Sequence, residues 1–265
     1  FFIFYFVLIT LLTGVTYAAE ETISFQVKQF EVEGDLPLSQ QKIDEILQPF
    51  HQQTYNPDNL QEVAKALEDI IRAQGYSFYR VIIPPQKLND GNVKLKVVAF
   101  VLGDLELQGN EYFSDANILH SIPTLIAGES PNTELVAEQL KVANRHPSKN
   151  LKLIFKQSKT AGFVDATLKV DEQKPQQFSL VETNTGSKAT GDHRVTAAYQ
   201  YANLFDKDHI INVSYTTSPD HTQDVKQYGV SYSLPVYQHK GWLSGYYVHS
   251  SVDTGIVAEV FDVAG

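Results

Sequence analysis

The stretch "GDHRVTAAYQYANL" at residues 191–204 alternates two kinds of side chain. The odd-numbered positions are mostly apolar and comprise Val195, Ala197, Tyr199 and Tyr201. The even-numbered positions are mostly polar and comprise Arg194, Thr196, Ala198 and Gln200. Because successive side chains of a β-strand point to opposite faces, this period predicts a strand whose faces meet different environments. In a soluble sheet the apolar face would pack on a protein core. In an outer-membrane barrel it would face lipid, and the polar face would line a wet lumen.

The same alternation recurs through the last third of the chain. Candidate strands lie at 177–185, 192–203, 208–218, 224–236, 241–251 and 255–263. Runs of roughly ten residues suit tilted membrane-crossing strands better than the 5 to 6 residues usual in soluble sheets. Bacterial outer-membrane barrels use at least about eight strands, so we expect residues 177–265 to be the amino-terminal part of a larger antiparallel barrel.

The polar parity favours a barrel over the alternative, a soluble antiparallel sheet with one wet face. The side chains expected on the inner face include Gln200, Gln227, Ser231, Ser233 and His249. They would be costly in a dry core, whereas a water-filled lumen solvates them. Aromatic residues also gather near the strand ends, as they do at bilayer interfaces. These residues are Tyr199, Tyr201, Tyr237, Trp242, Tyr246 and Tyr247.

An internal repeat occupies the first part of the chain. "FEVEGDLPLSQQKIDEIL" from Phe30 matches "LELQGNEYFSDANILHSI" from Leu105 at a constant offset of 75 residues. The offset pairs Gly34 with Gly109 and Ser39 with Ser114. A repeat at this period predicts two copies of one small module.

Each copy reads as β-α-α-β-β. An alternating strand ends at the turn glycine, and Ser39 or Ser114 stands where a helix N-cap belongs. A second helix has its apolar stripe at 60–71 or 135–143, and Gly75 fits a C-terminal cap of the first of these. Two strands then close each module, at 76–83 with 92–100 and at 151–158 with 162–170. A three-stranded sheet of this kind has edge strands, which can bind an extended peptide or stay solvated.

The amino terminus and the composition narrow the class further. Residues 1–19, "FFIFYFVLITLLTGVTYAA", form a charge-free apolar run that predicts a signal peptide cleaved near Ala18 or Ala19, with a membrane-spanning helix as the alternative. The absence of cysteine excludes a disulfide scaffold. A net charge of -10 without a basic stripe argues against a nucleic-acid partner.

The chain resembles a known family, the TpsB-type outer-membrane transporters of two-partner secretion, also called haemolysin secretion/activation proteins, within the Omp85 superfamily. The two β-α-α-β-β modules resemble its periplasmic POTRA domains, placed here at 22–100 and 101–172. The resemblance is carried by "GYSFYRVIIPPQKLNDGNVKLKVV" (75–98), "LELQGNEYFS" (105–114) and "ANRHPSKNLKLIFKQSKTAGFVDATLKV" (143–170). "NTGSKATGDHRVTAAYQYANLFDKDH" (184–209) resembles the opening barrel strands.

These motifs mark candidate site residues. Family-motif or partner-binding positions are Tyr76, Arg80, Pro84, Pro85, Gln86, Gly109, Asn110, Asn144 and Pro147. Gly191 and Arg194 are expected to face the barrel lumen. The resemblance implies that the POTRA domains capture one secreted exoprotein, such as a haemolysin or adhesin, in the periplasm of a Gram-negative bacterium. It also implies that a monomeric barrel in outer-membrane lipid secretes the exoprotein and, in some systems, activates it. An Omp85-type assembly factor is the alternative, but such factors resemble longer POTRA arrays.

Catalytic and metal motifs are not found in the sequence. None of the eight histidines has the spacing of a helical zinc pair. The chain has no G-x-S-x-G nucleophile elbow and no phosphate-binding loop. We therefore expect neither an enzyme nor a metal or cofactor site.

Overall fold

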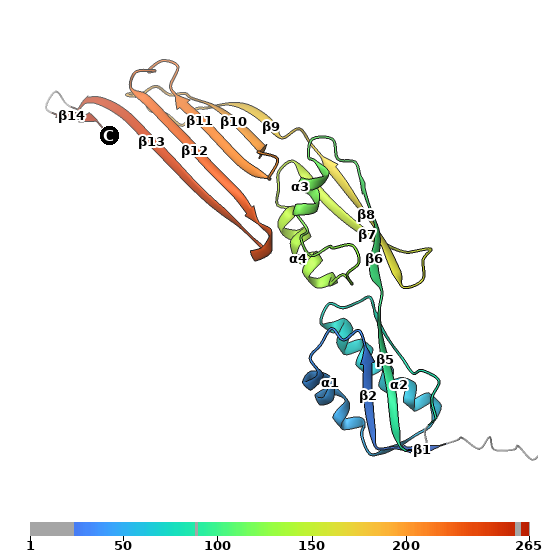
Figure 1. The fold of residues 1–265 in the computed structure, drawn as a ribbon. Helices are drawn as coiled ribbons and strands as arrows, with labels where there is room; N and C mark the ends of the chain where they lie inside the picture. Colours follow the sequence, from blue (N-terminus) through green and yellow to red (C-terminus); the bar gives the residue numbers. More distant parts are fainter. Residues whose placement is uncertain (1–23, 88–89, 258–260, 265) are drawn as a thin grey trace, which may run out of the picture.

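The structure, a computed structural model, describes residues 24–87, 90–257 and 261–264, and side chains as far as residue 254. Two small α/β modules follow one another, and a sheet of long strands extends beyond the second (Figure 1). The segment expected to be a signal peptide, residues 1–19, lies outside the described residues. Among the described residues, no α-helix is both long and apolar enough to cross a membrane.

The first module has a three-stranded sheet with helices on one face. Its elements are β1 (Phe25–Val27), β2 (Gln29–Gly34), α1 (Gln40–Leu47), η1 (Gln48–Phe50), β3 (Gln53–Tyr55), α2 (Pro57–Ala73), β4 (Tyr79–Ile82) and β5 (Asn92–Ala99). The sheet order is β2-β5-β4, with β2 parallel and β4 antiparallel to β5. Strands β1 and β3 form a separate antiparallel pair.

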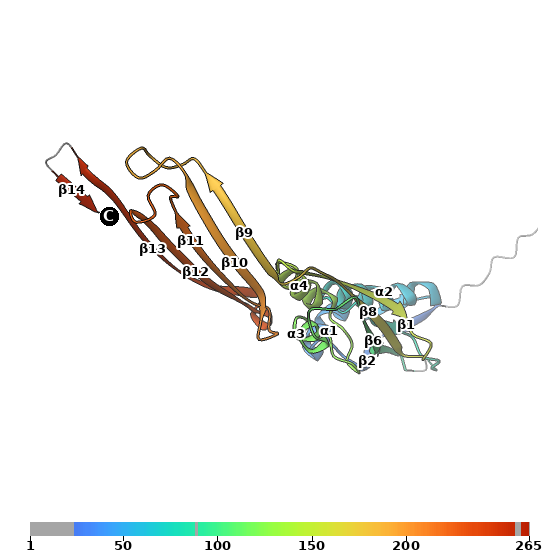
Figure 2. The ribbon, with the colours of Figure 1, turned by 90° about the horizontal axis from the view of Figure 1, so that it is seen from above.

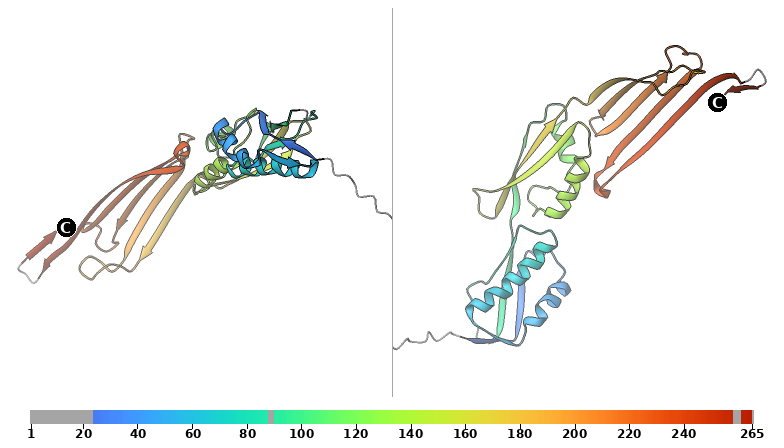
Figure 3. Two further views of the ribbon diagram at one scale, coloured as in Figure 1. Left: turned by 90° about the horizontal axis from the view of Figure 1, so that it is seen from below. Right: turned by 180° about the vertical axis from the view of Figure 1, so that it is seen from behind.

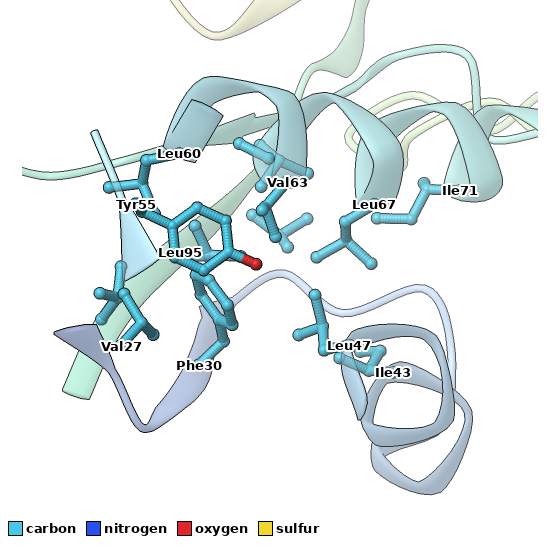
Figure 4. Packing of buried hydrophobic residues seen from close by; sticks show 14 residues of the cluster. Val27, Phe30, Ile43, Leu47, Tyr55, Leu60, Val63, Leu67, Ile71 and Leu95 are labelled. Carbon is cyan, nitrogen blue, oxygen red and sulfur yellow. The ribbon is translucent and has the colours of Figure 1, made fainter. Parts of the chain in front are cut away.

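The helices of this module begin and pack as their sequence dictates. Ser39 caps α1 by accepting a bond from the Lys42 amide, and Asn56 caps α2. Gly75 follows α2 at φ +87°, the left-handed region that a C-terminal glycine favours. The apolar stripe of α2 packs on α1 and on the sheet (Figure 4). The labelled core residues are Val27, Phe30, Ile43, Leu47, Tyr55, Leu60, Val63, Leu67, Ile71 and Leu95.

The second module repeats this plan. Its elements are β6 (Val101–Gln108), α3 (Asp115–His120), α4 (Thr133–Ala143), β7 (Lys149–Gln157) and β8 (Phe163–Glu172), with sheet order β6-β8-β7. Ser114 caps α3 as predicted. Gly34 and Gly109 both have positive φ, and a Cβ on either would lie 2.2 or 2.4 Å from a carbonyl oxygen of the neighbouring strand. The close approach explains why glycine recurs at the repeat offset.

The rest of the chain forms one antiparallel sheet, confirming the predicted strand-rich region. Its elements are β9 (Gln176–Thr183), β10 (Arg194–Leu204), β11 (His209–Thr217), β12 (Val225–Val236), η2 (Tyr237–His239), β13 (Gly241–Val257) and β14 (Phe261–Ala264). Neighbours in sequence are neighbours in the sheet, which curves away from the modules (Figure 2). The predicted break after residue 251 is wrong. Strand β13 continues because Val252 pairs with Val225 and the Asp253 amide donates to the Asp224 carbonyl.

The two faces of this sheet differ as the alternation predicts. The strand register aligns an exposed apolar row across five strands, made of Phe178, Tyr199, Val213, Val230 and Tyr247. The opposite face carries polar side chains that bond across strands in the pairs Thr196–Thr216, Asn212–Ser231, Gln227–Ser250 and Ser233–Ser244. This is the pattern of a barrel with a lipid face and a wet lumen.

One residue assigned to the inner face is on the other side. His249 pairs with Tyr228 and stacks on its ring at 6.4 Å between centroids, on the apolar face. The expectation was wrong because the register of β13 with β12 decides which side chains of β13 point to which face. The polarity of a side chain in β13 does not decide its face.

Candidate partner-binding site

The outer edge of β7 is the longest strand edge in the two modules. Among the described residues β7 pairs only with β8, over nine residues. One face of β7 packs Leu151 into the core, whereas Lys152 and Ile154 face outward on the other. An edge of this length offers main-chain donors and acceptors to an extended peptide.

Asn144 closes one end of this edge. Its side-chain oxygen accepts from the Leu151 amide at 2.6 Å, and its side-chain nitrogen donates to the Leu151 carbonyl at 2.9 Å. The main-chain groups of Leu151 therefore point away from β8. In an antiparallel ladder, alternate residues share an orientation, so the main-chain groups of Leu153, Phe155 and Gln157 face the same edge. The open part of the edge thus runs from Leu153 to Gln157.

A groove between the two modules adjoins the open edge. It encloses about 250 Å³. The lining residues are Phe78, Arg80, Phe100, Phe155, Lys156, Gln157, Phe163 and Val164. The rings of Phe78 and Phe155 meet at 4.7 Å between centroids, which joins the modules at its floor. Phe163 is 38% exposed, so apolar surface in the groove remains accessible.

The rim of the groove is cationic and only partly neutralised. Arg80 lies 3.4 Å from Glu68, and Lys156 lies 3.6 Å from Glu106. Both basic side chains are about half exposed, at 48% and 53%. The pKa of Glu106 is lowered by a hydrogen bond from Gln108 and by the charge of Lys156. A carboxylate on a bound segment could therefore bind the same cations.

Most motif residues of the first module stabilise its fold. Gln86 is an amide clamp like Asn144, because it accepts from the Lys94 amide at 2.8 Å and donates to the Lys94 carbonyl at 2.9 Å. It fixes the segment containing Pro84 and Pro85 to β5 beyond the end of β4. Tyr76 packs edge-on against Tyr79 at 5.5 Å. Of the motif residues in this module, Arg80 alone lines the groove.

The motif positions of the second module are also structural. Gly109 makes the close turn described above, and Asn110 donates to the Asp115 carboxylate at 2.7 Å, which fixes the start of α3. Asn144 is the clamp on β7, and Pro147 lies in the link from α4 to β7. Partner contact by these residues stays a prediction, and their observed bonds serve the turns and strand ends.

Gly191 and Arg194 lie at the end of the sheet away from the modules. The Arg194 guanidinium donates to the carbonyls of Thr190, Gly191 and His193 at 3.2, 2.8 and 3.0 Å. Gly191 has φ +87°, and a Cβ there would lie 2.0 Å from the Ser218 hydroxyl. Their role in the lumen stays a prediction. The Arg194 bonds hold the loop between β9 and β10 together from within, and Gly191 lets that loop lie close to Ser218 of the next loop.

Three aromatic residues predicted for the bilayer interface lie elsewhere. Tyr246 pairs with Ser231, so its side chain is on the polar face of the sheet. Tyr237 is 4% exposed, and its hydroxyl donates to Asp208. The Trp242 ring nitrogen donates to the Val142 carbonyl of α4 at 3.1 Å. Tyr237 and Trp242 therefore join the sheet to the second module, and the prediction was wrong for these two residues and for Tyr246.

Sequence reasoning missed the groove phenylalanines and the buried charge of Lys149. Lys149 is 3% exposed and precedes the strand start predicted at 151. One signal was available, because Lys149 has the same parity as the core residues Leu151 and Leu153. A lysine in phase with a buried face requires a partner.

Two family models match this chain. Residues 25–99 match the POTRA domain of ShlB type, and residues 162–264 match the haemolysin secretion/activation protein ShlB/FhaC/HecB. The two matches cover the first module, strand β8 of the second module and all of the long sheet that the structure describes. They agree with the fold assigned to each part.

Individual relatives are distant. The heme/hemopexin transporter protein HuxB of Haemophilus influenzae is 22% identical over 70% of this chain and 33% of its own length. The outer membrane transporter CdiB-2 of Burkholderia pseudomallei is 25% identical over 69% of this chain and 32% of its own. The chain thus spans about a third of the length of these curated relatives.

Solved structures share the fold over almost the whole chain. CdiB from Escherichia coli aligns with a TM-score of 0.77 and 20% identity over 95% of this chain and 46% of that one. CdiB from Acinetobacter baumannii aligns with a TM-score of 0.66 and 20% identity over 93% and 48%. Both alignments extend through the modules and the long sheet together.

Proposed function

The chain belongs to the haemolysin secretion/activation family of outer-membrane transporters, and from this premise we propose that it captures a secreted exoprotein and passes it through its barrel. It is an outer-membrane protein whose POTRA modules lie in the periplasm. In this proposal residues 22–100 and 101–172 are two periplasmic domains, and residues 177–265 begin the barrel. The protein acts as a monomer, without catalysis, metal or cofactor.

The observation that carries the proposal is the open edge of β7 beside the groove. An exported chain reaches the periplasm unfolded and offers extended segments, which can pair with Leu153–Gln157 as an added strand. An apolar side chain of the segment occupies the groove near Phe163, and an acidic side chain binds Arg80 or Lys156. Main-chain pairing gives affinity, and the groove gives selectivity.

The partner is a TpsA-type exoprotein, such as a haemolysin or adhesin, recognised through its amino-terminal region. The affinity of this region for the periplasmic modules is micromolar or weaker, because a short added strand and one groove bury little surface. An Omp85-type assembly factor is the alternative, and the match to the haemolysin secretion/activation family favours secretion over it.

A charge-reversal pair tests the proposal. Arg80→Glu should weaken binding of the exoprotein's amino-terminal region to the full-length transporter by roughly tenfold, because an acidic rim repels an acidic segment. Arg72→Glu is the matched control, since Arg72 binds the same Glu68 but does not line the groove. Equal binding by the two variants in a calorimetric titration would contradict the assignment of the groove.

A further inference from the structure

We infer that Lys149 and Asp208 are positioning residues that fix the second POTRA module in a single orientation under the barrel. Lys149 begins β7, and Asp208 ends the turn between β10 and β11. This turn and η2 both contact the second module, the turn through Lys149 and η2 through α3 and α4. Figure 3 shows the end of the long sheet beside the second module from two further directions. The inference concerns this joint and is independent of where the exoprotein binds.

The pair is buried and short. The Lys149 Nζ lies 2.7 Å from Asp208 Oδ2, and the two side chains are 0% and 1% exposed. Lys149 also donates to Asn117 Oδ1 at 2.7 Å and to Ser121 Oγ at 2.9 Å, both on or beside α3. All three donor hydrogens of the ammonium group therefore have an acceptor.

The carboxylate is equally well satisfied. Asp208 accepts from the Asn117 side-chain nitrogen at 3.0 Å, from the Ser121 hydroxyl at 3.3 Å and from the Tyr237 hydroxyl. Burial, followed by the charge of Asp208, raises the pKa of Tyr237, so its hydroxyl remains a donor. Burial lowers the pKa of Lys149, and the charge of Asp208 opposes this shift. The network joins the second module to the β10–β11 turn and to η2.

Neighbouring bonds follow the same interface. His146 accepts from the Ser148 amide through Nδ1, so Nε2 carries the proton and donates to the Ala202 carbonyl at 2.5 Å. The Asn203 side chain donates to the Tyr112 carbonyl at 3.2 Å. These are bonds to main-chain groups, which other polar groups or water could replace. The charge pair has no such substitute.

A buried ion pair sets orientation more than it sets affinity. Desolvation of two charges offsets most of their attraction, so the pair adds little net stability. A rotated arrangement that kept the interface closed would bury Lys149 or Asp208 without its partner, which is strongly unfavourable. The Lys240–Glu138 pair crosses the same interface with both side chains 43% exposed, so water can replace either partner. Of these two charge pairs, the buried one therefore discriminates between orientations.

Distance measurements between spin labels test this in the full-length transporter, reconstituted in liposomes. Residues 1–265 contain no cysteine, so within them cysteines introduced for labelling at Lys152 of β7 and Gln238 of η2, which are both exposed, are the only ones. Wild type should give one narrow distance distribution, and the control Glu138→Gln should match it. The double variant Lys149→Met with Asp208→Leu should give a distribution at least twice as wide, or a second distance.

The width of the distance distribution shows whether the buried pair or other contacts set the orientation of the module. A double variant as narrow as wild type would overturn the inference, because other contacts would then set the orientation. Heat-modifiable migration on gels checks that each barrel has folded. If the double variant does not insert, Asp208→Asn replaces it, because it keeps the side-chain size while leaving Lys149 without a counter-charge. A narrow distribution for that variant is likewise contrary to the inference.

Discussion

The two amide clamps allow one prediction to be worked out in magnitude. Asn144→Ala removes both hydrogen bonds to the main chain of Leu151, a residue that is only 2% exposed. Leaving a buried donor and a buried acceptor without partners costs about 1–2 kcal/mol each, or about 2–4 kcal/mol in all. Gln86→Ala removes the same two bonds from Lys94, but Lys94 is exposed and water replaces them at a cost of about 1 kcal/mol.

Hydrogen exchange of the full-length protein measures this difference locally. A local cost of about 2–4 kcal/mol should speed exchange of the β7 and β8 amides by about thirty-fold to several hundred-fold. Gln86→Ala should speed exchange in β4 and β5 by about fivefold. If Asn144→Ala accelerates exchange no more than Gln86→Ala does, burial does not set the strength of the clamp and the reasoning fails.

Three further changes follow from single contacts. Gly109→Ala should destabilise the second module by about 2 kcal/mol or more, because the added Cβ would lie 2.4 Å from a carbonyl oxygen. Gly162 also has a positive φ, +83°, but open space around it, so Gly162→Ala should cost about 1 kcal/mol. Urea unfolding measures both changes. Burial lowers the pKa of His146; the charge of Asp208 opposes this shift and the charge of Lys149 adds to it. Below about pH 6.5 the unfolded state therefore binds more protons than the folded state. Stability should therefore fall as the pH drops through that value, and His146→Gln should flatten the slope. Arg194→Leu should expose the loop before β10 to protease while β10 itself stays protected, as mapped by mass spectrometry of the fragments.

The parts of the fold that local rules decide could be predicted from the sequence. The repeat placed Ser39 and Ser114 at helix caps and Gly34 and Gly109 at tight turns, because caps and left-handed turns each restrict the residue type. The two-residue period likewise predicted the two faces of the sheet. These features depend on residues close together in the chain.

The features that sequence reasoning missed depend on distant pairing. His249 was assigned by its polarity, but the register with β12 puts it on the apolar face. Tyr237 and Trp242 have the aromatic character of an interface belt, and they pack on a protein module. Lys149 and Asp208 are 59 residues apart and meet only because the second module lies against the turns of the sheet.

Site-specific photocrosslinking during secretion tests the central claim most directly. A photoreactive residue at Gln157, on the open edge of β7, should crosslink to the amino-terminal region of the exoprotein when both are produced together. The same residue at Gln108, an exposed position on the β6 edge of the same sheet, is the control and should give little product. Capture at Gln157 is the result we expect, whereas equal capture at both positions, or capture at Gln108 alone, would contradict the proposed docking on β7.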